Sequence, residues 1–239
     1  MHINKDFRLP LSEYYSEIVT KNQIYLHHTV GGTGRSSLMW WIQDPRKVGA
    51  AYLVERDGTV YETFPPERWI HHLGIKADFN RKVNMQSIAI ELCSEGALRG
   101  GDELNKLLEI NNQIPRFKEE MLYAFDIVEN NSPNIWFKNA KPLYLKSQTH
   151  MYEDLKEKWR GFRYFDKYDE KQIQSVFELV KYLCKSFNIP KNIVPHTHYD
   201  INLANSFKGI LAHSNVREDK SDVHKLFPWN DLSKFINNS

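Results

Sequence analysis

The chain has 239 residues, a formal net charge of +2, and 41% hydrophobic and 13% aromatic residues. This composition can bury a substantial core, and the small net charge gives no general electrostatic reason to bind nucleic acid. The length suits one large domain or two small ones. We expect one folded domain, residues 1–239, that acts as a monomer and has no nucleic-acid partner.

The N-terminal segment MHINKDFRLPLSEYYSEIV has no basic start followed by an apolar run, so it is not a secretory signal. No stretch approaches the roughly eighteen apolar residues of a membrane span. We therefore expect a protein that is cytoplasmic as synthesised and has no membrane span. Within this segment, residues 12–20 are predicted to form a short helix.

An apolar run ending in His27 and His28 predicts the first core strand. Side chains alternate along a strand, so the two histidines point to opposite faces, and spacing alone does not choose between them. After a glycine-rich turn, Ser36 or Ser37 is predicted to cap a helix that runs to about Gln43. The large apolar side chains of this helix are expected in the core: Met39, Trp40 and Trp41.

A β-hairpin is predicted at Asp57-Gly58, because Asp-Gly between two apolar runs, here 50–55 and 59–64, is a strong hairpin signal. The segment that follows, Trp69-Ile70-His71-His72, has two interpretations. It is either an edge segment with surface histidines or part of a binding cleft.

The segment Ser87–Cys93 predicts a strand on which Glu91 shares one face with the small Ser87 and Ala89. The opposite face is apolar: Ile88, Ile90 and Leu92. Burying a charge is costly unless it is paired, so Glu91 has either a salt-bridge partner or a chemical role.

Residues 96–169 carry the weakest pattern and are interrupted by Pro115, Pro133 and Pro142. Residues 142–149 form a candidate strand. The basic and aromatic stretch 159–168 is suited either to stacking on sugar rings or to packing against the core. No linker or repeat is present, so we interpret 96–169 as an insertion within the single domain.

Asp169 is a candidate N-cap for an amphipathic helix that ends near Asn188. The two cysteines, Cys93 and Cys184, lie in a predicted strand and on the apolar face of this helix. We therefore expect buried thiols and no disulfide framework.

Residues 210–212 predict a short buried strand that ends in His213, and a loop carrying Lys220 and Asp222 follows. A histidine at a strand end and a carboxylate in the next loop can place two metal ligands on one centre. Catalytic zinc usually keeps three protein ligands and one open position. The third ligand is expected from the other strand that ends in histidine, residues 24–29.

Five stretches, in this order, resemble the zinc-dependent N-acetylmuramoyl-L-alanine amidases. That superfamily includes bacteriophage endolysins, muropeptide-recycling amidases and peptidoglycan recognition proteins. The resemblance covers roughly residues 21–228, with a poorly matching middle. The stretches are IYLHHT around His27, RDGTVYE at 56–62, WIHHLG at 69–74, SIAIELC at 87–93, and His213 to Asp222.

The resemblance implies an α/β fold, in which a central mixed sheet is flanked by helices and a zinc site lies in an open groove. It implies that His27, His213 and Asp222 hold zinc, which lowers the pKa of water and polarises the scissile carbonyl. Glu91 would then move the proton of the water, and Lys220 would stabilise the oxyanion.

The resemblance also implies a substrate, peptidoglycan or a muropeptide, cut between N-acetylmuramic acid and L-alanine, with Trp69 and His72 as substrate contacts. Of the possible roles we favour a phage-type endolysin that acts on the cell wall once released. The alternatives are a cytoplasmic enzyme that recycles anhydro-muropeptides and a peptidoglycan-binding protein without catalysis.

Two departures from the family pattern and one further motif leave alternatives open. Val223-His224 stands where family members often have proline and glycine, so the histidine is a rival ligand. The His196-Thr197-His198 motif is a second rival, although a structural or substrate-rim role is preferred. Residues 50–51 are alanines near the place of a tyrosine in some phage members, which puts more weight on Glu91.

Overall fold

The computed structural model describes residues 1–31, 33–100, 122–124 and 152–238, of which 98–100, 122–124 and 152–154 are described in backbone only. The candidate strand at 142–149 and the three prolines of the middle segment lie outside the described residues. Within the described part, no helix is both long enough and apolar enough to cross a membrane.

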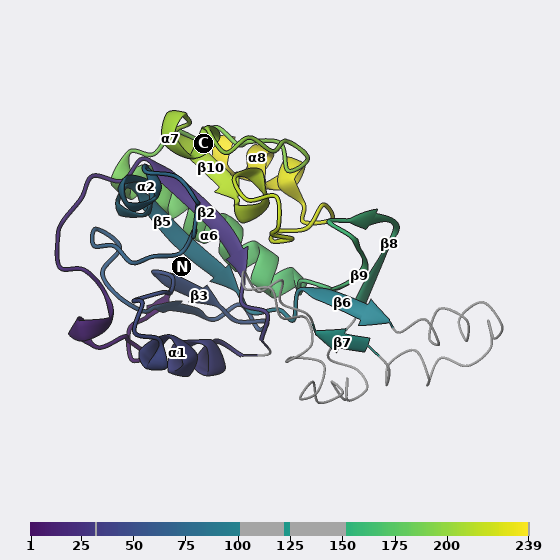
Figure 1. The fold of residues 1–239 in the computed structure, drawn as a ribbon, viewed down its shortest axis with the longest axis horizontal. Coiled ribbons are helices and arrows are strands. Elements are labelled where there is room, and N and C mark those ends of the chain that lie inside the picture. Colours follow the sequence, from purple (N-terminus) through teal and green to yellow (C-terminus); the bar gives the residue numbers. More distant parts are fainter. Residues whose placement is uncertain (32, 101–121, 125–151, 239) are drawn as a thin grey trace.

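A six-stranded mixed sheet forms the centre of the molecule (Figure 1). Strands β3, β5, β2 and β10 run parallel to one another, and β4 and β1 run in the opposite direction. In spatial order the strands are β1 (Ile3–Asn4), β4 (Val60–Glu62), β3 (Tyr52–Val54), β5 (Ser87–Leu92), β2 (Gln23–His28) and β10 (Gly209–Ala212). The predicted mixed sheet is confirmed.

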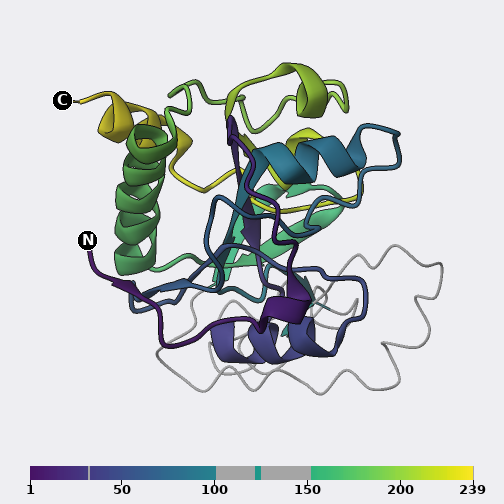
Figure 2. The same cartoon turned by 90° about the vertical axis from the view of Figure 1, so that its left-hand side faces the viewer.

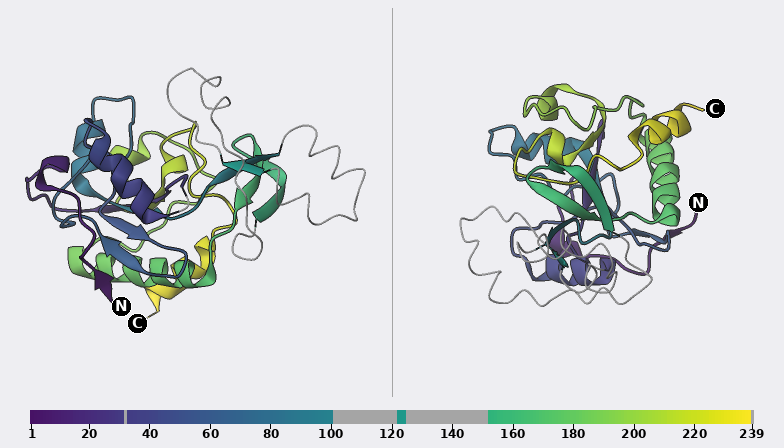
Figure 3. Two further views of the ribbon diagram at one scale, coloured as in Figure 1. Left: turned by 90° about the horizontal axis from the view of Figure 1, so that it is seen from below. Right: turned by 90° about the vertical axis from the view of Figure 1, so that its right-hand side faces the viewer.

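Helices cover both faces of this sheet (Figures 2 and 3). One face carries α6 (Glu170–Phe187) and α8 (Trp229–Asn237). The other carries α1 (Gly34–Gln43) and α2 (Asn80–Gln86), and the short α7 (Leu203–Ser206) precedes β10. Two 3-10 turns complete the helical elements: η1 (Leu11–Glu13) and η2 (His213–Asn215).

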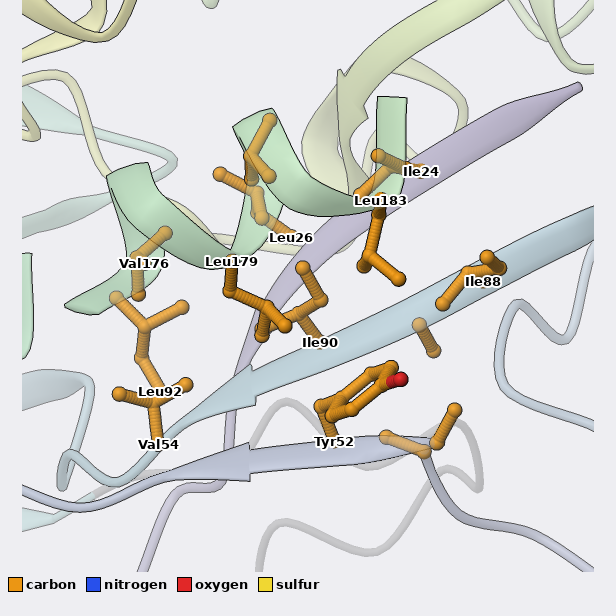
Figure 4. Packing of buried hydrophobic residues seen from close by; sticks show 14 of the residues in the cluster. Ile24, Leu26, Tyr52, Val54, Ile88, Ile90, Leu92, Val176, Leu179 and Leu183 are labelled. Atoms are coloured by element: carbon orange, nitrogen blue, oxygen red, sulfur yellow. The ribbon is translucent and has the colours of Figure 1, made fainter. Parts of the chain in front are cut away.

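The face under α6 is the main core, because β2 and β5 alternate and send one set of aliphatic side chains toward that helix. Full burial of each such side chain stabilises the fold by about 1.5–3 kcal/mol. The amide of Gln172 fastens the helix to the sheet by donating to two backbone oxygens, Val54 O at 2.9 Å and Cys93 O at 3.0 Å. The packed side chains are Ile24, Leu26, Ile88, Ile90 and Leu92 from the sheet, and Val176, Leu179 and Leu183 from α6 (Figure 4).

A second, antiparallel sheet lies beside the carboxyl ends of the central strands (Figure 1). In spatial order it contains β7 (Leu122–Ala124), β6 (Ala97–Gly100), β9 (Phe162–Asp166) and β8 (Tyr152–Trp159). Phe165 is fully buried, and the buried carboxylate of Asp166 pairs with Arg56 of the β3–β4 hairpin. The aromatic stretch 159–168 therefore packs mainly against the core.

Several predicted elements are confirmed. The Asp57-Gly58 hairpin forms, and Gly58 has a φ of +89° there. The helix after Asp169 ends at Phe187 with Asn188 in the left-handed conformation, although the Asp169 side chain makes no capping hydrogen bond. Both cysteines are buried and free: Cys93 and Cys184.

Other predictions were wrong. The predicted helix at 12–20 does not form, because the backbone of Tyr15 bridges to Trp69 in an extended conformation. Helix α1 is capped by the Thr33 hydroxyl, which accepts from the Ser36 amide at 3.2 Å, and neither serine is the cap. Trp41 is buried as expected, but two other large side chains of this helix are about half exposed: Met39 at 47% and Trp40 at 54%.

Candidate active site

Three neighbouring parallel strands end at the same edge of the central sheet and carry the candidate residues in a row. In the sheet register His27 of β2 lies opposite Glu91 of β5. Ala212 of β10 lies opposite Leu26, so the next residue, His213, falls beside His27. Adjacent strands are about 4.8 Å apart, and paired residues share a face. The order of these side chains across the edge is therefore Glu91, His27, His213.

The loop after β10 brings Asp222 back to this edge. Its Oδ2 atom lies 3.1 Å from His27 Nδ1 and 3.1 Å from His213 Nδ1, and the two Nδ1 atoms are 3.1 Å apart. All three residues are buried, with 2%, 5% and 6% of their surface exposed for His27, His213 and Asp222. Together they form a group that is able to hold one metal ion.

The protonation of His213 follows from its other nitrogen. His213 Nε2 lies 2.9 Å from the carbonyl oxygen of Leu73. A carbonyl can only accept, so Nε2 carries the proton. In the neutral ring, Nδ1 then points a lone pair toward His27 and Asp222.

The protonation of His27 is set by a longer chain of contacts. The Ser87 hydroxyl donates to Val83 O at 2.7 Å, so it accepts from His72 Nε2, also at 2.7 Å. His72 Nδ1 is then unprotonated and accepts from His27 Nε2 at 3.0 Å. The remaining nitrogen, His27 Nδ1, therefore directs a lone pair into the same space as His213 Nδ1.

Electrostatics favour neutral His27 and ionised Asp222, which are the forms that bind metal. Burial, reinforced by His213, lowers the pKa of His27 to about 4, and burial with His27 as its neighbour holds the pKa of His72 well below its usual value. Burial opposes ionisation of Asp222, but His213 and the contacts with both histidines outweigh it and hold its pKa well below the usual range. Two lone pairs and a carboxylate thus converge, an arrangement suited to binding a cation.

Glu91 and Lys220 border this group. Both residues are half-buried, so each keeps some access to solvent. Glu91 stands one strand away from His27 on the same face. Lys220 is close enough for its charge to contribute to the lowered pKa of His27, after the larger effects of burial and His213.

The rival ligands lie elsewhere. His28 faces the opposite side of β2, where its Nδ1 is 3.0 Å from the hydroxyl of Tyr168. His224 is buried and stacks on the Tyr168 ring at 4.7 Å. The 196–198 motif is tied to η2 through its backbone, since Asn215 donates to His198 O at 2.7 Å. In the part of the chain that the structure describes, no other three such side chains converge.

The two predicted substrate contacts have other partners. Trp69 is 1% exposed and its ring stacks on Tyr15 with centroids 3.8 Å apart, so no surface is left for a substrate in this conformation. His72 does lie next to the metal-ligand group, but both of its nitrogens face protein groups, His27 and Ser87. We therefore assign His72 to holding His27.

Sequence reasoning missed the residues that support the ligands. Asn84 accepts from the amides of His72 and Leu73, at 2.7 and 3.2 Å. Arg217 donates to the carbonyls of Leu73 and Gly74, at 3.1 and 2.6 Å. These contacts join segments far apart in sequence, and no local pattern marks them.

The profile of one protein family, N-acetylmuramoyl-L-alanine amidase (Amidase_2), matches residues 19–225 of this sequence. The chain belongs to this family. It is therefore a hydrolase that acts on a linear amide, the bond between N-acetylmuramic acid and L-alanine in peptidoglycan.

Two solved structures of PlyL agree on the fold of this amidase. The structure of PlyL is similar, with a TM-score of 0.52 and 16% identity over 99% of this chain and 97% of that chain. The structure of a PlyL point mutant has a TM-score of 0.52 and 14% identity over the whole of both chains. A complex of AmiD from E. coli with anhydro-N-acetylmuramic acid-L-Ala-D-gamma-Glu-L-Lys has a TM-score of 0.48 and 17% identity over 95% of this chain and 60% of that chain. Comparison with curated proteins gives no match.

Proposed function

We propose that this amidase is zinc-dependent and acts on polymeric cell wall as a phage-type endolysin. The observation that supports a bound metal is the convergence of three unprotonated donor atoms, each 3.1 Å from the other two. Donor atoms about 2.0–2.1 Å from a tetrahedral zinc are about 3.3 Å apart, so the group is close to the required size. Two imidazoles and a carboxylate are also ligands that zinc accepts.

Bound by His27, His213 and Asp222, zinc supplies Lewis acidity toward water and toward the substrate carbonyl. The protein residues supply the rest. Glu91, on the same face as His27, takes a proton from the attacking water and returns it to the leaving nitrogen. Lys220 places a positive charge where the oxyanion develops.

The preference for polymeric wall rests on the insertion at 96–169, which is long and contains many aromatic residues. Cleavage of a small soluble muropeptide gives no reason for so large an addition to the domain.

The test is a comparison of two substrates with one enzyme preparation. Intact sacculi and soluble anhydro-muropeptides are offered under the same conditions, and release of peptide from N-acetylmuramic acid is measured. We expect faster cleavage of sacculi; a preference for the soluble anhydro-muropeptide identifies a recycling enzyme instead. Binding without cleavage of either substrate identifies a non-catalytic peptidoglycan-binding protein.

Metal content is measured on the same sample. We expect one zinc per chain and loss of activity when it is removed by a chelator. Lys220→Ala should keep zinc and lower kcat by roughly 10²–10³-fold, as expected for one oxyanion donor. Normal turnover of that variant would return Lys220 to an ordinary solvent-exposed charge.

A further inference from the structure

The loop that carries Lys220 and Asp222 has few supports of its own. Its internal contacts are a few backbone hydrogen bonds, such as Ser214 N to Asp222 O at 2.8 Å and Lys220 N to Arg217 O at 3.3 Å, and one ion pair, in which Arg217 Nε donates to Asp219 at 2.8 Å. On one side Arg217 ties it to the carbonyls of residues 73 and 74. A loop that must hold both the metal ligand Asp222 and the catalytic side chain of Lys220 needs a second support, because small shifts of the loop displace both residues.

The β8–β9 hairpin lies beside this loop on the other side (Figures 1 and 3), and the residues at its tip supply three hydrogen bonds. Arg160 donates through Nη2 to Ser214 O and through Nη1 to Glu218 O, both at 2.9 Å. The indole nitrogen of Trp159 donates to Ser221 O at 3.0 Å.

Two of the three residues whose carbonyls receive these bonds adjoin residues of the site. Ser214 follows the ligand His213, and Ser221 lies between Lys220 and the ligand Asp222. A guanidinium group has a rigid planar fork of donors, so Arg160 can fix two carbonyls at once. Its two hydrogen bonds therefore fix the distance between the carbonyl oxygens of residues 214 and 218.

The tip is built for this contact. Arg160 has a φ of +50° and Gly161 a φ of +88°, the two positive values of a tight type I′ hairpin turn. Asparagine or glycine is the usual first residue of such a turn, and arginine is disfavoured there. The guanidinium also lies over two rings, Trp159 at 5.3 Å and Tyr199 at 5.5 Å, which hold it in place.

The base of the hairpin is anchored. Phe165 is fully buried, and the Asp166 carboxylate accepts from the Ser94 hydroxyl at 3.1 Å and the Glu95 amide at 2.6 Å. The tip is thus a fixed point relative to the ends of the central strands.

We propose that Trp159 and Arg160 are positioning residues of the active site, which hold the loop so that Asp222 meets the metal and Lys220 meets the substrate. This proposal rests on the proposed zinc amidase. Arg160 does not act as a substrate contact here, since both of its terminal nitrogens are directed at backbone oxygens of the same chain.

The experiment compares the full-length protein with Arg160→Ala, Arg160→Lys and Trp159→Phe, and uses Lys158→Ala as the control. Lys158 is an exposed cation of the same strand. Three quantities are measured: zinc affinity by competition with a chelator, kcat and KM on peptidoglycan fragments, and the melting temperature. Supporting residues of metal sites typically contribute about 10–100-fold in affinity or activity.

We expect Arg160→Ala to lower zinc affinity and kcat each by about 10-fold or more, with little change in KM. Arg160→Lys, which can reach only one carbonyl, should fall between the wild type and Arg160→Ala. Trp159→Phe keeps the ring and loses one donor, so it should show a smaller loss, and Lys158→Ala should show none. Unchanged zinc affinity and kcat in both arginine variants overturns the proposal, as does a loss of melting temperature alone.

If Arg160→Ala fails to fold, Arg160→Lys and Trp159→Phe still decide the matter by the same two measurements. Failure of the proposed function has a different signature. In that case the wild type itself binds no zinc or cleaves no amide, whatever the hairpin variants do.

Discussion

His27 and His28 are consecutive and both buried, yet they belong to different regions of the molecule. His27 meets His213, Asp222 and His72 through polar atoms at 3.0–3.1 Å. His28, on the other face of β2, meets Tyr168 and lies against the backbone of Gly96. Strand alternation alone separates them. One face of the strand end carries the three converging side chains of the metal-ligand group, and packed side chains fill the other face.

The largest expected difference is between alanine variants of the two histidines. His27→Ala removes one of three converging donors and should lose both zinc and activity. His28→Ala should keep zinc and lose stability, by about 1–3 kcal/mol, because it leaves a buried polar partner and a cavity. Zinc per chain and the midpoint of denaturant unfolding are measured for both. Full zinc in His27→Ala would contradict the assignment of the two faces.

Glu91→Gln tests the face of the sheet that carries His27 without altering the shape of the side chain. The amide keeps the size of the side chain and loses the proton acceptor, so kcat should fall by roughly 10²–10⁴-fold, the usual span for acid–base catalysis. Zinc content and melting temperature should stay close to those of the wild type. A variant that folds, binds zinc and still cuts at the full rate removes Glu91 from the mechanism.

The sequence predicted this face because its signals are local. A histidine at the end of each of two apolar runs and a carboxylate on a third are visible in a window of a few residues. Their convergence followed from the parallel register, in which His27 lies opposite Glu91. The choice of His27 over His28 came from family resemblance, since alternation separates the two but does not name either.

What surrounds the ligands depends on contacts between distant segments, and sequence patterns do not report these. Trp69 was predicted at the substrate, but its ring is covered by Tyr15, 54 residues earlier in the chain. The edge strand Ile3–Asn4 is two residues long and depends entirely on pairing with β4. Arg160 reaches its carbonyls across a similar separation.

Gly96→Ala tests the packed face. Gly96 has a φ of +68°, and a Cβ atom there would lie 2.5 Å from His28 Nε2. Strain of this kind typically costs about 1–3 kcal/mol, so the free energy of unfolding should fall by that amount. Zinc content and the turnover of each folded molecule should be unchanged, because the clash is on the far side of β2. Loss of zinc in this variant would show that the two faces are coupled.

The smallest effect is expected at Ser87, the last residue of the hydrogen-bonded series that runs from His27 through His72. Ser87 accepts from His72 Nε2 while its own proton goes to Val83 O. Ser87→Ala removes the hydroxyl that determines which nitrogens of His72 and His27 carry a proton. His27 Nδ1 is then no longer held unprotonated. Zinc affinity and kcat should each fall by about 10-fold, the lower end for such supporting residues.

Ser175→Ala is the matched control, because its hydroxyl donates to a backbone oxygen, Gly58 O at 2.7 Å, at a position outside the site. Both variants lose one hydroxyl that donates to a carbonyl, so a purely structural effect would be similar in the two. Ser87→Thr restores a hydroxyl and should recover part of the zinc affinity that alanine loses. If Ser87→Ala binds zinc as tightly as Ser175→Ala, the metal itself determines which nitrogen of His27 carries the proton. The contacts of His72 with His27 and Ser87 then contribute packing alone.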